Sequence, residues 1–327
     1  MIEVQNITKR YGAVEAVKDI SFSVGKDQVL GFLGPNGAGK TTIMKILTGY
    51  HFPSEGTATL DGFSISDDPV EVKKRTGYLP ESVPLYNDMT VEEYLSFIAA
   101  ARLIPPEKQK EARDKSITDC GLKDVRSQLM ETLSKGYKQR VGLAQAIIHD
   151  PAILILDEPT SGLDPNQIIE IRSLIKELGK SKTVILSTHI LQEVEAICSR
   201  VLILNEGKIA AQGTPEEIAG TLKGGDTWEL VLKGKNSKVT EIKEKCSKFG
   251  SQYLHINFDT APTIKEDNGL FNVSFFIPSA RSDAANPGEL IFDWAVAEGL
   301  KILGMNRHKL SLEDIFVKLT EAGNGNP

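Results

Sequence analysis

The chain has 327 residues, which exceeds what one hydrophobic core usually supports, so two domains are expected. Its net charge of −6 argues against a nucleic-acid partner, because nucleic-acid affinity rests largely on Lys and Arg neutralising phosphates. The three cysteines are far apart in the sequence, as is typical of reduced thiols in the cytosol. No apolar run approaches the roughly 18 residues that span a bilayer, so any membrane passage is expected to belong to another polypeptide.

Up to about residue 60, many segments of the chain alternate apolar and polar residues. The stretch 20–24 reads Ile-Ser-Phe-Ser-Val, and this alternation predicts short antiparallel strands. The apolar run 29–33 predicts a buried strand, and residues 34–41 then read Gly-Pro-Asn-Gly-Ala-Gly-Lys-Thr ahead of a predicted helix start. This order of strand, glycine-rich loop and helix is the context in which such an octapeptide binds phosphate.

The predicted phosphate loop has a physical basis. Its glycines let backbone N–H groups turn toward an anion, and the helix dipole adds positive potential. Lys40 can reach the β- and γ-phosphates of a nucleoside triphosphate, and the Thr41 hydroxyl can ligate Mg²⁺. A glycine-rich turn without a ligand is the alternative, which the flanking strand and helix disfavour. The predicted nucleotide contacts of this loop are Gly34, Pro35, Asn36, Gly37, Ala38, Gly39, Lys40, Thr41 and Thr42.

A helical lobe is predicted from about residue 85 to residue 150. Thr90 and Glu93 have the spacing of a capping box, apolar residues follow at helical spacing, and the pair Pro105-Pro106 is expected to end that helix. Residues 133–140 read Leu-Ser-Lys-Gly-Tyr-Lys-Gln-Arg and precede a long apolar helix. In isolation, this string is an ordinary helix start with Ser134 as its cap.

Two carboxylates follow the apolar run 153–156, which has the character of a central parallel strand. Ligands bind at the carboxyl edge of such sheets, so we expect Asp157 to hold Mg²⁺ and Glu158 to polarise the water that attacks the γ-phosphate. A solvated acidic strand end is the alternative. Further on, Asp164 and Pro165 start a helix that extends to Gly179. A second apolar strand, 183–186, leads into Ser187-Thr188-His189.

The chain resembles the nucleotide-binding subunits of ATP-binding-cassette (ABC) transporters, whose third motif reads Leu-Ser-Gly-Gly-Gln. Ser134 and Gly136 match that motif, whereas Lys135 and Tyr137 depart from it. The resemblance covers about residues 1–220. It implies a P-loop NTPase core with a mostly parallel sheet and helices on both faces, an antiparallel β subdomain and a helical subdomain.

The same resemblance implies roles for single residues. Tyr11 falls where the family stacks an aromatic ring on adenine, and Glu81 replaces a glutamine that touches the metal and the membrane partner. Asp164 ends the loop 161–164, which in this family crosses to the partner subunit. His189 matches the switch histidine that contacts the γ-phosphate.

The function implied is an ATPase subunit of a membrane exporter at the cytoplasmic face of the membrane. In the family, two such subunits, in a homo- or heterodimer, sandwich ATP between the phosphate loop of one and the Leu-Ser-x-Gly helix start of the other, and so drive a separate transmembrane permease. A soluble cassette protein acting on ribosomes or chromosomes is the alternative, disfavoured because the chain has neither two cassettes nor a long coiled-coil insertion. An importer subunit is the third possibility.

The sequence changes character near residue 220, where residues 222–226 are predicted as a linker. Strand-like runs at 228–232 and 271–277 and helical stretches near 238–249 and 288–299 predict a small α+β domain, 221–327, of ferredoxin-like type. This domain has no catalytic constellation, so we expect a regulatory or packing role. The stretch 311–316 is similar to the end of export subunits for drugs, polysaccharides and gliding motility.

Overall fold

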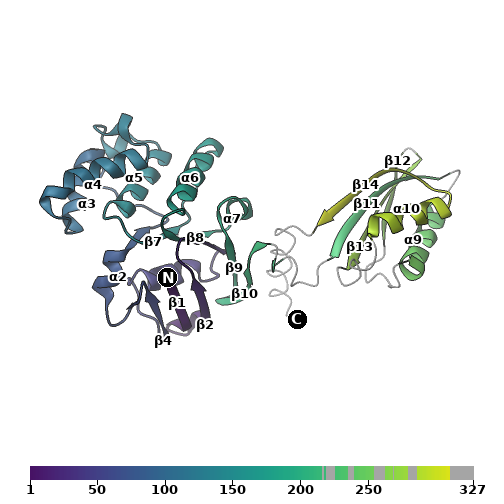
Figure 1. Cartoon of the computed structure of the whole chain (residues 1–327), viewed down its shortest axis with the longest axis horizontal. Coiled ribbons are helices and arrows are strands. Elements are labelled where there is room, and N and C mark those ends of the chain that lie inside the picture. The colour runs from purple at the N-terminus through teal and green to yellow at the C-terminus, as the bar shows by residue number, and fades with distance from the viewer. Residues whose placement is uncertain are drawn as a thin grey trace. The chain divides into compact units, whose positions relative to one another are not determined.

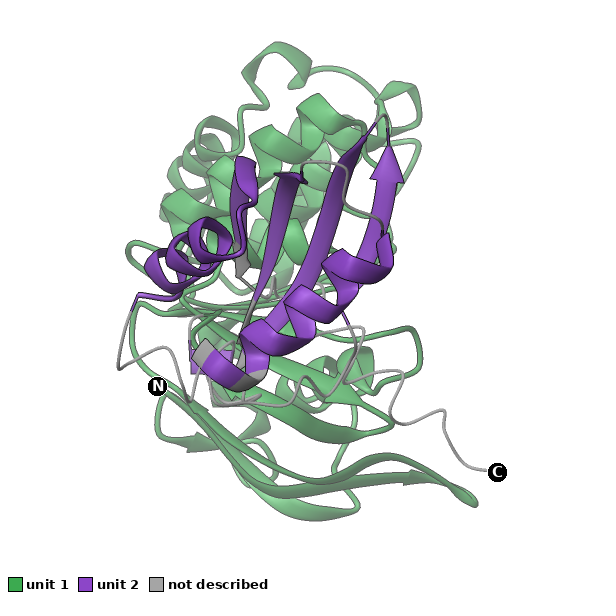
Figure 2. Ribbon diagram, turned by 90° about the vertical axis from the view of Figure 1, so that its right-hand side faces the viewer, with its two compact units in different colours: residues 1–215, 319–327 green, residues 216–318 purple. Residues whose placement is uncertain are grey.

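The computed structural model describes residues 1–215, 217–218, 225–234, 239–253, 262–267, 269–278 and 286–309. These residues fall into two compact units, one within Met1–Pro215 and one within Glu216–Lys318 (Figure 2). Each unit has its own apolar core. Among the described residues, no helix combines the length and the apolar composition needed to cross a bilayer.

An antiparallel sheet opens the first unit. Its strand order is β2-β1-β4-β5, and the strands are β1 (Ile2–Tyr11), β2 (Val14–Val24), β4 (Glu55–Leu60) and β5 (Phe63–Ser64). Alternate side chains of β2 are buried toward its carboxyl end, which is the pattern of a sheet with one face in the core. The predicted antiparallel strands of the first 60 residues are therefore confirmed.

The central sheet has the order β10-β9-β3-β8-β7-β6. Neighbours among β6, β7, β8, β3 and β9 pair in parallel, and β10 pairs with β9 in antiparallel fashion. Every residue of β3, β7 and β8 is buried, as expected for strands covered on both faces. The bounds are β3 (Val29–Leu33), β6 (Thr76–Leu79), β7 (Ile153–Asp157), β8 (Thr183–Thr188), β9 (Arg200–Asn205) and β10 (Lys208–Gly213).

Helices cover both faces of this sheet (Figure 1). Phe32 of β3 shares a core with Ile43 and Met44 of α1, whereas a side chain at Gly31 would meet Cys198 and Val194 on the face covered by α7. Because successive strand residues point to opposite faces, α1 and α7 lie on opposite sides. The bounds are α1 (Lys40–Leu47), α2 (Pro69–Arg75), α6 (Pro165–Leu178) and α7 (Leu191–Ile197).

The predicted helical lobe consists of α3 (Val91–Ala101), α4 (Pro106–Asp119) and α5 (Lys135–Ile147), with short 3₁₀ turns at Lys123–Val125 and Met130–Thr132. Thr90 and Glu93 form both bonds of the capping box, as predicted. The prolines act differently from the prediction: α3 already ends at Ala101, and Pro106 begins α4. Proline suits this first helical position because its missing N–H has no partner there in any case.

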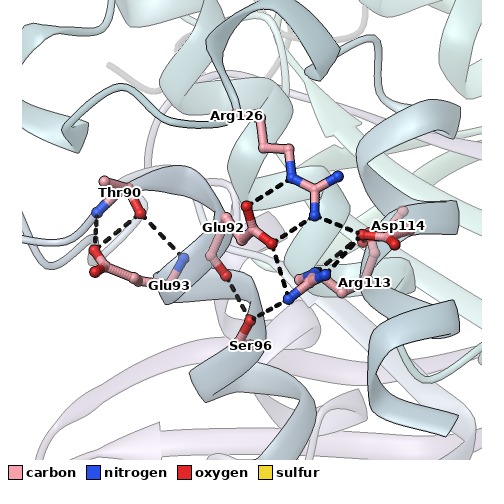
Figure 3. Close-up of polar contacts among 8 residues, drawn as sticks. Thr90, Glu92, Glu93, Ser96, Arg113, Asp114 and Arg126 are labelled. Carbon is pink, nitrogen blue, oxygen red and sulfur yellow. Dashed lines mark hydrogen bonds and ion pairs between the residues drawn. The ribbon is translucent and has the colours of Figure 1, made fainter.

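Charged side chains join the elements of the lobe (Figure 3). The Arg126 guanidinium donates two bonds to Glu92 of α3, at 2.7 and 2.5 Å. Arg113 of α4 lies 3.0 Å from Glu92 and 3.0 Å from Asp114, and it also bonds the Ser96 hydroxyl at 3.2 Å. Such guanidinium–carboxylate pairs fix the positions of the elements that they join, because both groups are planar and can form two parallel hydrogen bonds.

Replacing Arg113 with alanine should lower stability by about 1 kcal/mol, or about 2–4 °C in melting temperature for a unit of this size. The side chain is mostly buried, and its loss leaves Glu92 with one cation instead of two. Thermal unfolding checks this result. The control is Lys115→Ala on the same helix, which removes only an exposed i,i+4 ion pair with Asp119. Equal melting temperatures for Arg113→Ala and wild type would show that the cluster contributes nothing to the lobe.

The second unit has the element order β11-α9-β12-β13-α10-β14, with the sheet order β12-β13-β11-β14. This is the predicted ferredoxin-like arrangement. In Figure 2, both helices lie against one face of the strands, where Phe249 of α9 and Trp294 of α10 pack in one core. The bounds are β11 (Gly225–Lys233), α9 (Val239–Tyr253), β12 (Thr263–Asp267), β13 (Leu270–Pro278), α10 (Pro287–Ala297) and β14 (Lys301–Lys309).

One prediction for this unit is wrong in part. Gly225 and Asp226, assigned to a linker, instead begin β11, where they pair with Pro278 and Ile277 of β13. Ladder bonds from a neighbouring strand outweigh the low strand propensity of glycine and aspartate. Residues 222–224 and the stretch 311–316 lie outside the described residues.

Candidate nucleotide site

The glycine-rich loop connects β3 to α1, as the sequence predicts. Gly37 and Gly39 have φ angles of +83° and +104°, a backbone region that disfavours side chains. At Gly39 a Cβ atom would also lie 2.8 Å from the Ala16 carbonyl oxygen. The helix then begins at Lys40, so its unpaired N–H groups face the loop.

A cavity of about 480 Å³ opens beside this loop. It brings together residues from five distant parts of the sequence, including the predicted Tyr11, Glu81, Glu158 and His189. The lining residues are Tyr11, Ala16, Asn36, Gly37, Gly39, Lys40, Thr41, Thr42, Glu81, Glu158, Ser161 and His189. Phosphate-binding, acidic and aromatic groups therefore share one site.

Lys40 is buried at the centre of this site. Its ammonium donates to the carbonyl oxygens of Gly34 at 2.7 Å and Pro35 at 3.2 Å, and it lies 3.7 Å from Glu158 Oε1. Burial lowers the pKa of Lys40, and the nearby carboxylates of Glu158 and Asp157 oppose that effect. The ammonium is thus fixed inside the loop, where it faces the region expected to hold phosphate.

Glu158 adopts an unusual backbone conformation, with φ at +48°. Its N–H donates to the Ser187 hydroxyl at 3.0 Å and to the Ser187 carbonyl at 3.2 Å, which holds this conformation. The carboxylate lies 2.9 Å from His189 Nδ1. Burial raises the pKa of Glu158, and the charges of His189 and Lys40 oppose the rise. A raised pKa makes a carboxylate a better proton acceptor.

Oxygen donors suited to Mg²⁺ lie beside the loop. The Thr41 hydroxyl is 3.3 Å from Asp157 Oδ1, and Ser187 donates to the same oxygen at 2.5 Å. Glu81 lines the same cavity. Mg²⁺ prefers hard oxygen ligands and usually takes part of its shell from substrate phosphates. Within the described part of the chain, no group of three or more His, Cys, Asp or Glu residues could hold a metal ion.

Ser134, Gly136 and Asp164 do not line this cavity. Ser134 caps α5 by accepting a bond from the Tyr137 N–H at 3.3 Å, and Asp164 caps α6 by accepting from the Gln167 N–H at 2.9 Å. A side chain at Gly136 would collide with Gln167, so the starts of the two helices lie side by side. These three residues therefore lie outside the cavity that their own chain forms beside the loop.

Sequence reasoning missed several residues around the site. Ser161 lines the cavity, Ser187 holds both Asp157 and the Glu158 backbone, and Glu193 is buried beneath them. The sequence did carry a signal for Ser187, because this residue lies near the end of a predicted strand, close to His189. Glu193 had none, since an acidic residue near a helix start is typically solvated.

Comparison with known proteins agrees with this geometry. The profile of the family described as "ABC transporter" matches residues 17–161. The chain is 32% identical to the "Bacitracin transport ATP-binding protein BcrA" of Enterococcus faecalis, over 99% of this chain and 97% of that protein. The chain belongs to the ABC transporter ATP-binding proteins. ABC ATP-binding proteins are ATPases, so this chain binds and hydrolyses ATP.

Other ABC proteins are also similar to this chain over most of its length or over most of their own. The "Uncharacterized ABC transporter ATP-binding protein YxlF" of Bacillus subtilis is 30% identical over 98% of this chain and 100% of its own length. Among solved structures, cbiO1 from Clostridium perfringens, titled "Part of the ABC transporter complex cbiONQ", is 29% identical, with a TM-score of 0.62 over 67% of this chain and 90% of that one. The family match at residues 17–161 lies within the first unit.

Proposed function

We propose that this ABC protein is the ATP-hydrolysing subunit of a membrane exporter, held at the cytoplasmic face of the membrane by a separate transmembrane permease. The observation that supports this most directly is the meeting of Lys40, Glu158 and His189 in one cavity beside the phosphate loop. Similarity over nearly the full length to a bacitracin transport protein supports transport. Similarity to a linearmycin resistance ATP-binding protein favours export over import, because removal of an antibiotic from the cell confers resistance.

Hydrolysis of ATP depends mainly on aligning the attacking water with the γ-phosphate and on neutralising the phosphate charge. Lys40 and the loop N–H groups bind the β- and γ-phosphates, and Tyr11 stacks on the adenine. Glu158 polarises the attacking water, and His189 orients that carboxylate through the 2.9 Å contact. Mg²⁺, when bound, would neutralise phosphate charge, with Thr41, Asp157 and Glu81 as its protein ligands.

A second subunit completes the site in this proposal. Ser134 is exposed at the start of α5, Gly136 is buried two residues later, and neither lines the cavity of its own chain. This supports a role for the helix start in contacting ATP held by a partner subunit. A second helix N-terminus facing the γ-phosphate favours ATP over ADP, since ADP lacks that anion. Closure on ATP and release after hydrolysis would then drive the permease.

A separate cavity suits the permease. It has a volume of about 1250 Å³ and lies at the amino-terminal edge of β6, β7 and β8, which is opposite the edge that bears Asp157 and Thr188. Leu103 lines it and is 83% exposed, in a left-handed conformation that projects the turn between α3 and α4. Leu103 shares this cavity with the apolar side chains of Val70, Ile104 and Leu178, and an apolar patch at a concave site is typical of a protein-binding surface. We assign this cavity to a cytoplasmic segment of the permease.

Replacing Leu103 with glutamate should abolish co-purification of a multi-span membrane protein while leaving the ATPase rate of the isolated subunit unchanged. The charge would disrupt an apolar contact but lies far from the nucleotide cavity. Affinity purification from detergent-solubilised membranes checks the result. Phe292→Glu is the control, because Phe292 is also an exposed apolar residue but lies in the second unit. Recovery of ribosomes or chromosomal proteins in place of a membrane protein would favour the soluble alternative.

The two domains, 1–220 and 221–327, divide this work in the proposal. All the proposed nucleotide ligands lie in the first domain. For the second domain we propose a regulatory or packing role.

A further inference from the structure

One buried charged residue has no place in the chemistry above. Glu193 lies in the first turn of α7 and is 1% exposed. A buried carboxylate is costly unless hydrogen bonds and an opposite charge compensate it, so its contacts identify what it stabilises. Glu193 follows His189 by four residues, and none of its atoms lines the nucleotide cavity.

The two carboxylate oxygens of Glu193 bind different segments. Oε1 accepts a bond from the Thr160 hydroxyl, and Oε2 accepts one from the Thr188 hydroxyl at 2.6 Å. The Thr188 hydroxyl also accepts from the Ile190 N–H at 3.0 Å, which fixes its direction. Both threonines are buried. Arg172 of α6 supplies the opposite charge, with one guanidinium nitrogen 3.7 Å from Oε1.

These threonines flank the two groups assigned to hydrolysis. Thr160 lies two residues after Glu158, in the turn where the Leu163 N–H donates to the Thr160 carbonyl at 3.2 Å. Thr188 directly precedes His189 at the end of β8. One carboxylate therefore ties the turn that carries Glu158 to the strand end that carries His189.

We propose that Glu193 is a positioning residue, which holds Glu158 and His189 at the separation that their 2.9 Å contact requires. This proposal rests on the roles given to Glu158 and His189 under the proposed function. Misplacement by about 1 Å can cost about 100-fold in rate. Because Glu193 is outside the nucleotide cavity, its loss affects turnover and leaves ATP binding intact.

The test uses the full chain with Glu193→Gln, Thr160→Val and Thr188→Val. Glutamine keeps the size of the side chain but removes its charge and one acceptor, and valine is nearly isosteric with threonine. Each should lower kcat about 10- to 100-fold, with the KM for ATP and the Kd for a non-hydrolysable ATP analogue within about twofold of wild type. Combining Glu193→Gln with Thr188→Val should lower kcat less than the product of the single effects, since both break one network.

Thr183→Val is the matched control. Thr183 is a buried threonine of the same strand, at the end away from the site, where its hydroxyl bonds Gly25 and the Asp27 N–H. It should lose comparable stability and keep its kcat. A fall in kcat for Thr183→Val as large as that for Thr188→Val would overturn the proposal, because loss of stability alone would then explain both.

Two outcomes separate this proposal from the function on which it rests. If Glu158→Gln is inactive but Glu193→Gln and Thr188→Val turn over ATP normally, the positioning role is wrong and the catalytic assignment stands. If Glu158→Gln itself turns over ATP, the catalytic assignment is wrong, and the positioning role with it. Should Glu193→Gln not fold, the two valine variants decide the matter.

Discussion

Glu158→Gln should bind ATP as well as wild type and lose at least about 100-fold in turnover, because the amide cannot accept a proton from the attacking water. The carboxylate is buried, its pKa is raised by burial, and it faces His189 at 2.9 Å. In the proposed cycle, this variant should also accumulate an ATP-bound dimer, since hydrolysis is what releases the closed state. Phosphate release and size-exclusion chromatography with Mg-ATP measure both effects.

Glu177→Gln is the control for this experiment. Glu177 lies on α6 with a well-exposed side chain paired to Lys180, and exposed pairs of this kind contribute little. Its variant should behave as wild type in both assays. Normal turnover in Glu158→Gln would remove this carboxylate from the mechanism and leave His189 or Asp157 to be tested as its replacement.

The sequence predicts the components of this site better than their arrangement. Asp157 and Glu158 follow a buried run, and in parallel sheets such strand ends meet at one edge, so their proximity to the phosphate loop was predictable. The left-handed backbone of Glu158 was not. It depends on the hydroxyl and carbonyl of Ser187, which a neighbouring strand supplies from 29 residues away. No local pattern records such a bond.

Glu193 illustrates the same limit for buried charge. From sequence, an acidic residue in a helix start favours the helix dipole and is usually solvated. Only the packing of α7 beside α6 and β8 excludes water from it and brings Arg172 within 3.7 Å. Its contacts with two threonines follow from tertiary structure alone.

The second unit shows which strands a sequence conceals. The apolar alternation of 228–232 and 271–277 predicts β11 and β13, which form the middle of the sheet. The edge strands β12 and β14 were missed, because β12 reads Thr-Ile-Lys-Glu-Asp and β14 contains a glycine and several basic residues. Edge strands have one free side and are often polar, which removes the periodic signal.

Lys40→Ala should weaken ATP binding itself, by about 10- to 100-fold, which corresponds to the about 1.5–3 kcal/mol of a charged hydrogen bond. The ammonium now bonds the Gly34 and Pro35 carbonyls and lies 3.7 Å from Glu158. Phosphate must draw it away from these oxygens, so the measured loss in affinity is the difference between two environments.

Lys45→Ala is its matched control, because Lys45 lies at the opposite end of the same helix. Isothermal titration with ATP and with ADP separates the phosphates: loss of a contact with the γ-phosphate weakens ATP more than ADP, whereas collapse of the loop weakens both equally. If Lys40→Ala binds ATP with the affinity of wild type, the glycine-rich turn is not the phosphate site, and the geometry of Glu158 and His189 beside it would need another explanation.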